Sequence, residues 1–184
     1  DDFWSNIGLS EIEIYGEESD IEAAENKNHV NAAGVTAEAS TTEASSLPVS
    51  NIKDGNNQTR WASDYSEASK QTVTVTFPKV TLVKELDFDL HTRDVAPMPS
   101  NVKSFDLVYA DAAGTEHTVK ISNAKSTESG KTGYVTNVQH IFETPVYMKS
   151  FKMTNFDLQI DIEGQNGYNN ISILEVRAYS NDQS

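Results

Sequence analysis

The segment NIKDGNNQTRWASD (51–64) carries the residues whose types and spacing most directly suggest a binding site. Asp54, Asn56 and Thr59 place three oxygen-bearing side chains within a short stretch. Asp-Gly-Asn is a tight-turn sequence, because glycine tolerates positive φ and Asp or Asn side chains bond their own backbone. Such a bent loop also turns backbone carbonyls inward, and Ca²⁺ takes six to eight oxygens at about 2.3–2.6 Å. The segment alone is compatible with both an ordinary turn and a cation site.

Paired carboxylates, which a glycosidase needs on both sides of the scissile bond, occur elsewhere in the chain. They are Asp87 and Asp89, and a second group at Asp157, Asp161 and Glu163. Asp87 and Asp89 alternate with apolar residues, so we expect them on a solvated strand face. The chain contains no GxSxG, HExxH, P-loop or GxGxxG motif. Its histidines show no metal-ligand spacing; they are His29, His91, His117 and His140. We therefore expect a protein that is not an enzyme.

The segments around these residues are predicted to form β-strands. QTVTVTF (71–77), ELDFDLH (85–91) and SFDLVYA (104–110) alternate apolar and polar residues with the period of a half-buried strand. The side chains predicted to face inward are Val73, Val75, Phe77, Leu86, Phe88, Leu90, Phe105, Leu107 and Tyr109. DAAG (111–114) predicts a turn into a partner strand around Thr118–Ile121. Further β-rich runs are Tyr134–Phe142, Met148–Asn155 and Ile171–Tyr179, whereas only Ser19–Asn28 reads as helical. The pattern predicts an all-β, antiparallel β-sandwich.

An internal repeat suggests how the chain is divided. NIGLSEIEIY (6–15) is similar to NISILEVRAY (170–179), with Glu11 matching Glu175. One interpretation is that two edge strands are alike by chance. The interpretation we favour is that residues 1–16 are the terminal strand of a preceding module and residues 17–30 are an acidic linker. The main module then spans residues 31–180, and residues 181–184 form a tail.

Composition excludes several classes of partner. The chain has 184 residues with 14 Lys and Arg against 28 Asp and Glu, a net charge of −14, and a mean hydropathy of −0.51. Phosphate backbones and anionic lipid favour the opposite charge, so we expect neither nucleic acid nor membrane as a partner. The absence of cysteine excludes disulfides and thiolate zinc sites. It also favours a bacterial extracellular protein or a cytosolic protein over a secreted animal domain. The N-terminus DDFWSNIG is no signal peptide, so we expect any targeting signal to be removed or to lie outside the sequence.

A family resemblance enters with the segment DGNNQTRWASD (54–64). With the small polar stretch TAEASTTEASS (36–46) before it, QTVTVTF after it and the closing strand ISILEVRAY (171–179), the chain resembles a discoidin-type domain. This is the fold of coagulation factor V/VIII C-type domains. The bacterial members that it most resembles are the family 32 carbohydrate-binding modules. Over roughly residues 31–180, the resemblance implies a jelly-roll β-sandwich with a structural Ca²⁺ near one end.

The resemblance also names the residues of this calcium site. The implied ligands are the Lys53 carbonyl together with Asp54, Asn56, Thr59 and Glu175. Glu175 interrupts the apolar run ILEV, where a carboxylate is costly unless it is paired or coordinated.

Sugar binding is implied at shallow loops along the edge of the sandwich. The residues that match by order are Asp64, Tyr65, His91, Arg93, Asn101, Asn166 and Tyr168. Planar polar groups would hydrogen-bond hydroxyls and an aromatic ring would cover the sugar's C–H patch. Tyr168 could instead pack at the rim of the core, and Arg93 could simply pair with Asp94. The Pro-rich stretch DVAPMPSN (94–101) departs from the family pattern, and we expect Trp61 in the core.

The sequence thus predicts a non-catalytic carbohydrate-binding module in a secreted or cell-surface bacterial enzyme that degrades glycans. By resemblance the ligands are glycan termini of the galactose, GalNAc or GlcNAc type, and the other partners are neighbouring modules of the same polypeptide. The alternative is a discoidin-type adhesion module that binds protein or phospholipid. A third class, a small β-sandwich hydrolase or lyase, would need a cluster of acidic or basic residues that the sequence does not show.

Overall fold

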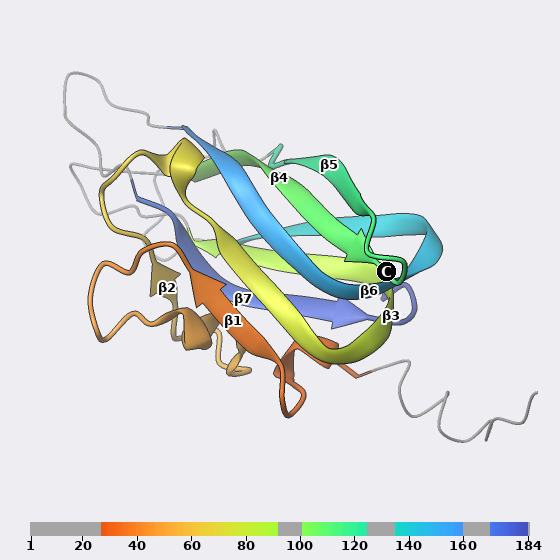
Figure 1. The fold of residues 1–184 in the computed structure, drawn as a ribbon. Coiled ribbons are helices and arrows are strands. Elements are labelled where there is room, and N and C mark those ends of the chain that lie inside the picture. Colours follow the sequence, from red (N-terminus) through yellow and green to blue (C-terminus); the bar gives the residue numbers. More distant parts are fainter. Residues whose placement is uncertain (1–26, 92–100, 125–134, 160–169, 184) are drawn as a thin grey trace, which may run out of the picture.

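The computed structural model describes residues 27–91, 101–124, 135–159 and 170–183, and these ranges are built mainly of strands (Figure 1). The strands are β1 Thr36–Ala39, β2 Trp61–Ala62, β3 Val73–His91, β4 Asn101–Asp111, β5 Glu116–Ser122, β6 Val135–Gln159 and β7 Ser172–Tyr179. Three short 3-10 helices, η1 His29–Asn31, η2 Val49–Lys53 and η3 Ala68–Lys70, complete the described part. No helix among these residues is long and apolar enough to cross a bilayer. The predicted all-β fold is confirmed.

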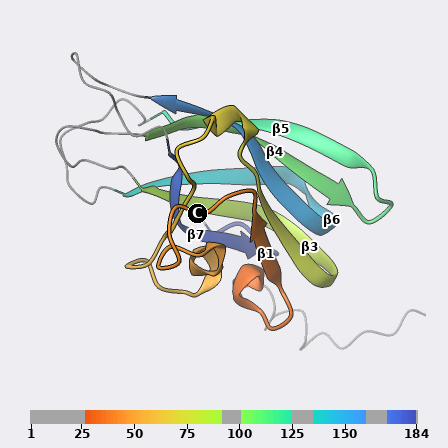
Figure 2. The ribbon, with the colours of Figure 1, turned by 60° about the vertical axis from the view of Figure 1, so that its left-hand side comes forward.

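All strand pairs in these ranges are antiparallel. The strand order is β2-β7-β3-β6-β4-β5, and β1 pairs with the first part of β3 outside this order. The first part of β3 pairs with β1 and with the last part of β6, which also pairs with β4. The last part of β3 pairs with β7 and with the first part of β6. Figures 1 and 2 show β3 and β6 as long curved strands that run through both layers of the resulting sandwich.

These two crossings join segments that the sequence suggests as separate strands. QTVTVTF and ELDFDLH are both parts of β3, and the runs at 134–142 and 148–155 are both parts of β6. The β3–β6 register shifts between Thr76 and Thr81 and again between Val83 and Glu85. A bulge bends a strand and increases its local twist, so each long strand turns from one layer into the other without a loop.

The core lies between the layers and is built from the alternating positions. Val73, Val75, Phe77, Leu86, Phe88, Leu90, Phe105 and Leu107 are all buried, as predicted, and Tyr109 is partly buried. Phe88 packs edge-on against Phe105, with ring centroids 5.0 Å apart, and also contacts Phe151. Trp61 is fully buried, as expected, and its indole N–H donates to the carbonyl oxygen of Thr41 (3.1 Å). Aromatic side chains therefore hold the two layers together.

The predicted solvated face at Asp87 and Asp89 is wrong. Both residues are only 7% exposed, and neighbouring Glu85 is fully buried. β3 is a central strand of its layer, so side chains of β6 and β7 cover its outer face. Asp89 accepts a hydrogen bond from Asn137 (2.8 Å) and is paired with Arg177.

The N-terminal boundary also differs from the linker prediction. Asn28 Oδ1 accepts hydrogen bonds from the backbone N–H groups of Val30 (3.0 Å) and of Ala178 in β7 (3.1 Å). Val30 is fully buried in the core. The packed module therefore begins before the predicted boundary at residue 31. The repeat-based assignment of residues 1–16 lies outside the described residues, as does most of the predicted helix at 19–28.

Candidate functional site

The oxygen-rich loop begins where η2 ends at Lys53. Asp54 caps this helix, and Gly55 follows with φ +75°, a conformation that favours glycine. A Cβ at Gly55 would also lie 3.1 Å from Asn31 Nδ2. Both constraints favour glycine at this turn, which directs the backbone N–H groups of residues 55 and 56 toward β7.

Glu175 of β7 receives those N–H groups. Its Oε1 accepts hydrogen bonds from Gly55 N (2.7 Å) and Asn56 N (3.1 Å), which joins segments about 120 residues apart. The side chain is 2% exposed. Glu175, an acid within an apolar strand, therefore anchors the loop to β7.

Inside the loop, the Asp54 carboxylate organises the turn. Its Oδ1 accepts from Asn56 N (2.8 Å), and its Oδ2 accepts from the Thr59 hydroxyl (2.7 Å). Burial acts to raise the pKa of Asp54, but the hydrogen bonds from Thr59 and Asn56 outweigh it and lower that pKa. Asp54 is exposed and stays ionised at neutral pH.

Without a cation nearby, the ionised form of the Glu175 carboxyl is unfavourable. Burial, and next the neighbouring Asp54 carboxylate, raise the pKa of Glu175 to about 7, against the opposing effect of the Gly55 and Asn56 N–H groups. Glu175 Oε2 is buried and has no hydrogen-bond partner. A buried carboxylate oxygen without a partner is costly. Two adjacent carboxylates with one such oxygen fit a bound cation.

The predicted calcium ligands are only partly assembled. Asp54 and Glu175 lie together, whereas the Asn56 side chain accepts from Gln58 N (3.0 Å) and the Thr59 hydroxyl also donates to Asn56 O (2.7 Å). Lys53 is half-buried at the end of η2. In the described ranges, no three His, Cys, Asp or Glu side chains form a group that could hold a metal. A cation here would therefore need backbone carbonyls as well as the two carboxylates, which Ca²⁺ accepts.

Three of the predicted sugar-binding residues, Asp64, Tyr65 and His91, lie at the same end of one layer. Ala62 pairs with Ser172, and Ile173 pairs with both Trp61 and Leu90. This register places the segment after β2, with Asp64 and Tyr65, near the end of β3 at His91. Arg93, Asn166 and Tyr168 lie outside the described residues, and of Asn101 only the backbone, at the start of β4, is described.

Asp64 and Tyr65 differ in how they are used. Asp64 Oδ1 accepts from the N–H and the hydroxyl of Ser66 (3.0 and 2.5 Å) and from Gln71 Nε2 (3.3 Å), so this oxygen organises its own turn. Tyr65 is 50% exposed and donates its hydroxyl proton to Glu43 Oε1 (2.7 Å). Tyr65 is therefore the described residue of the predicted set that offers an aromatic face to solvent.

Glu43 is a site residue that the sequence did not suggest. Besides the bond to Tyr65, its Oε2 accepts from Asn170 Nδ2 (3.1 Å), just before β7. It thereby links the loop of residues 40–47 to the exposed ring. Glu43 lies in a small polar stretch without periodicity, so only the spatial neighbours of its carboxylate reveal its role.

Comparisons with known proteins agree on a fold. The family model described as "F5/8 type C domain" matches residues 36–176. A family 32 carbohydrate-binding module of Clostridium perfringens NanJ, solved with galactose, is 22% identical with a TM-score of 0.55, covering 79% of this chain and 93% of that one.

Two further solved structures are equally similar in fold. A family 32 module from a C. perfringens family 31 glycoside hydrolase is 19% identical with a TM-score of 0.57, covering 84% of this chain and 98% of that one. A mutant lectin binding domain of lectinolysin, complexed with Lewis b, is 16% identical with a TM-score of 0.56, covering 86% and 99%. No curated protein matches the chain.

Proposed function

The chain belongs to the F5/8 type C, or discoidin-like, domain family, and from that premise we propose that it is a non-catalytic carbohydrate-binding module. Its ligands are glycan termini of the galactose, GalNAc or GlcNAc type. It serves a secreted or cell-surface bacterial enzyme that degrades glycans, and it holds that enzyme on its substrate by adding a second attachment point.

The observation that carries the proposal is the exposed Tyr65 ring at the loop end of the sandwich. Its hydroxyl is fixed by Glu43, whose other oxygen is bonded to Asn170, so the ring is held in place before any ligand binds. A fixed aromatic face costs little conformational entropy when a sugar stacks on it. Solved structures of the same fold contain galactose and Lewis b in their complexes, which supports a sugar as the ligand here.

We further propose that Ca²⁺ stabilises the loop end. Asp54 and Glu175 would hold the ion together with oxygens of residues 53–59, including the Lys53 carbonyl and the oxygens of Asn56 and Thr59. When bound, the ion would supply positive charge to the two carboxylates and a partner for Glu175 Oε2. The loop that it ties to β7 leads into β2 and Tyr65, so its role is to fix the binding face and not to react.

A glycan array followed by calorimetry on the best glycan tests the proposal. We expect a Kd between roughly 10 µM and 1 mM, or about 4–7 kcal/mol, because a shallow site buries little surface. Tyr65→Ala should weaken binding about tenfold, as should Arg93→Ala and Tyr168→Ala. Tyr65→Phe is the matched control, since it keeps the ring and removes only the bond to Glu43.

The outcomes separate the candidate functions. Binding retained by Tyr65→Phe and lost by Tyr65→Ala supports stacking on this ring. An array without any bound glycan, in Ca²⁺ as well as in EDTA, would contradict the proposal. Binding to phosphatidylserine vesicles or to a protein would then favour the adhesion alternative.

A further inference from the structure

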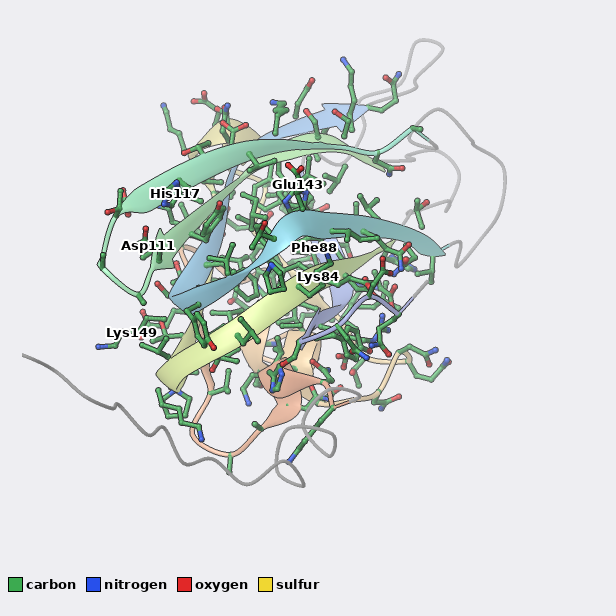
Figure 3. The ribbon with its side chains drawn as sticks, turned by 90° about the vertical axis from the view of Figure 1, so that its right-hand side faces the viewer. Lys84, Phe88, Asp111, His117, Glu143 and Lys149 are labelled. Atoms are coloured by element: carbon green, nitrogen blue, oxygen red, sulfur yellow. The ribbon has the colours of Figure 1, made fainter. Side chains whose placement is uncertain are left out.

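A hollow lies at the end of the sandwich opposite the proposed sugar site around Tyr65 (the loop site), and Figure 3 looks onto this end. β4 runs the length of its layer from Asn101 to Asp111, about 33 Å at the usual rise per residue, so the two ends are well separated. The hollow has a volume of about 480 Å³, within the range of small-molecule sites. Its lining comprises Tyr109, Asp111, Ala112, Ala113, His117, Thr144, Pro145, Val146 and Tyr147.

The β4–β5 hairpin forms one wall and is held by the Asp111 carboxylate. Asp111 Oδ1 accepts from the backbone N–H groups of Ala113 and Thr115, both at 2.9 Å. Its Oδ2 lies 2.9 Å from His117 Nε2, and the His117 ring stacks on Tyr109 with centroids 5.0 Å apart and planes 18° apart. Two contacts therefore fix the imidazole in orientation.

The bend of β6 forms the other wall. Its register against β3 jumps between Val83–Val146 and Glu85–Ile141, so residues 142–145 form an extended bulge. Lys84 Nζ donates to the carbonyl oxygens of Phe142 (2.6 Å) and Glu143 (3.1 Å) and satisfies the backbone that the bulge releases from the ladder. Tyr147 follows the bulge and is 58% exposed. The bend thereby presents an aromatic ring to the hollow.

The polar groups of this hollow are mostly acceptors. A carboxylate can only accept, so in neutral His117 the proton lies on Nε2 and Nδ1 is an acceptor. Asp111 Oδ2 has a further lone pair, and the hydroxyls of Thr144 and Tyr147 can donate or accept. None of the described lining residues is lysine or arginine. Such a surface suits a ligand that brings hydroxyl donors and an apolar face without negative charge.

We propose that this hollow is a second carbohydrate site that takes a neutral hexopyranose. The sugar would stack its C–H face on Tyr147 and donate hydroxyl protons to His117 Nδ1 and the Asp111 carboxylate. Anionic sugars would be disfavoured, because their carboxylate would face that of Asp111. The choice of ligand class rests on the proposed function, whereas the location rests on the hollow alone. Two sites at opposite ends would let one module bridge two glycan chains.

Side-chain NMR of the full chain tests the site directly. Methyl β-D-galactopyranoside and N-acetylglucosamine serve as neutral probes, and glucuronic acid serves as the anionic probe. We expect the imidazole resonances of His117 and the ring resonances of Tyr147 to shift saturably with a neutral probe, with a Kd of about 1 mM or weaker. Glucuronic acid should shift them at least several-fold less at equal concentration.

Variants separate this site from the loop site. Tyr147→Ala and His117→Ala should each weaken the response at this end about tenfold, whereas Arg93→Ala should leave it unchanged. Lys149→Ala is the matched control, because Lys149 is exposed at the same end and does not line the hollow (Figure 3). A neutral probe that shifts only resonances of the loop end overturns this inference and leaves the proposed function standing. A chain that binds no sugar at either end overturns both.

Discussion

Three buried carboxylates on β3, Glu85, Asp87 and Asp89 (the β3 set), lie beside the buried Glu175 of β7 on the outer face of one layer, and their charges are compensated differently. Asp89 of β3 is the register partner of Glu175 of β7, and Asp87 is the partner of Arg177. Asp89 has the Arg177 guanidinium and the Asn137 amide as partners. Glu175 has two backbone N–H groups, a second carboxylate nearby and an oxygen without any hydrogen bond.

The comparison separates carboxylates whose negative charge is offset by neighbouring side chains from Glu175, for which we propose a bound cation. In the β3 set, Gln139 Nε2 and Gln183 N donate to Glu85, and only Asp87 Oδ1 is left without a hydrogen bond. Arg177 therefore pairs with Asp87 and Asp89, whereas Glu85 accepts hydrogen bonds from neutral donors. Arg177 also acts on Glu175 electrostatically, but its ion pairs are with Asp87 and Asp89. Among the described contacts Glu175 has no ion pair of its own, which is why Ca²⁺ is proposed there and not at the β3 set.

The largest effect on stability should follow from removing Arg177, the cation that pairs with the β3 set. Arg177→Met leaves Asp87 and Asp89 without their cation, and we expect the free energy of unfolding to fall by about 3–5 kcal/mol. Urea denaturation at pH 7.5 measures it. Adding Asp87→Asn and Asp89→Asn to Arg177→Met should restore much of the loss, because the two acids that Arg177 pairs with are then neutral and need no cation.

A surface pair supplies the control for that experiment. Lys120 and Asp106 are paired at 3.6 Å, but the lysine side chain is 51% exposed. Lys120→Met should cost less than about 1 kcal/mol. A loss of similar size for both variants would show that burial does not distinguish the two pairs.

The next largest effect on stability concerns Ca²⁺ binding at Glu175. Ca²⁺ at 100 times its Kd should raise the free energy of unfolding by about 2.7 kcal/mol relative to EDTA. Glu175→Gln should abolish this gain. In EDTA at pH 8, however, the same variant should equal or exceed the wild type, since the amide keeps an acceptor for the loop N–H groups and removes the repulsion from Asp54.

Asp87→Asn is the matched control, because it changes a buried acid of the same face outside the proposed calcium site. It should keep the full Ca²⁺ response. If Ca²⁺ leaves the thermal midpoint of the wild type unchanged, and elemental analysis of the purified protein finds no metal, the calcium proposal is wrong.

The smallest effect is a pH dependence in EDTA. Burial, then Glu85, raise the pKa of Asp87 to about 7, partly offset by Arg177 and Gln139. Between pH 3.8, the ordinary pKa of Asp87, and pH 7, the folded state binds more protons than the unfolded state. The contribution of Asp87 to the free energy of unfolding is therefore highest at low pH and is lost as the pH rises through 7. From pH 5 to pH 8, the wild type should lose roughly 2.5 kcal/mol relative to Asp87→Asn, because the proton difference persists over about two pH units at about 1.36 kcal/mol each.

Taking the difference between the two proteins removes the contributions of other groups. His29 and His140, whose pKa values are lowered first of all by burial, act in the opposite direction and are common to both. Parallel stability curves for wild type and Asp87→Asn would show that Asp87 keeps its ordinary pKa in the fold.

Local patterns in the amino-acid sequence were enough to predict core side chains of the strands and the turn at DAAG. Alternation at Val73, Val75 and Phe77 specified the buried face, because successive side chains of a strand point to opposite sides. The DAAG turn was equally local, since Gly114 has φ +84° and Asp111 accepts from Gly114's neighbours Ala113 and Thr115. Features that depend on a few consecutive residues can be predicted without knowledge of the fold.

The segments that cover each face of the sheet, and the contacts at each site, depend on the fold. The alternation around Asp87 is the same for a solvated and for a covered strand; the central place of β3 between β6 and β7 buries it. Glu175 contacts a loop about 120 residues away, and the hollow beside His117 needs the bend of β6. Long-range pairing sets these contacts, and no local pattern records which distant strand will become the neighbour.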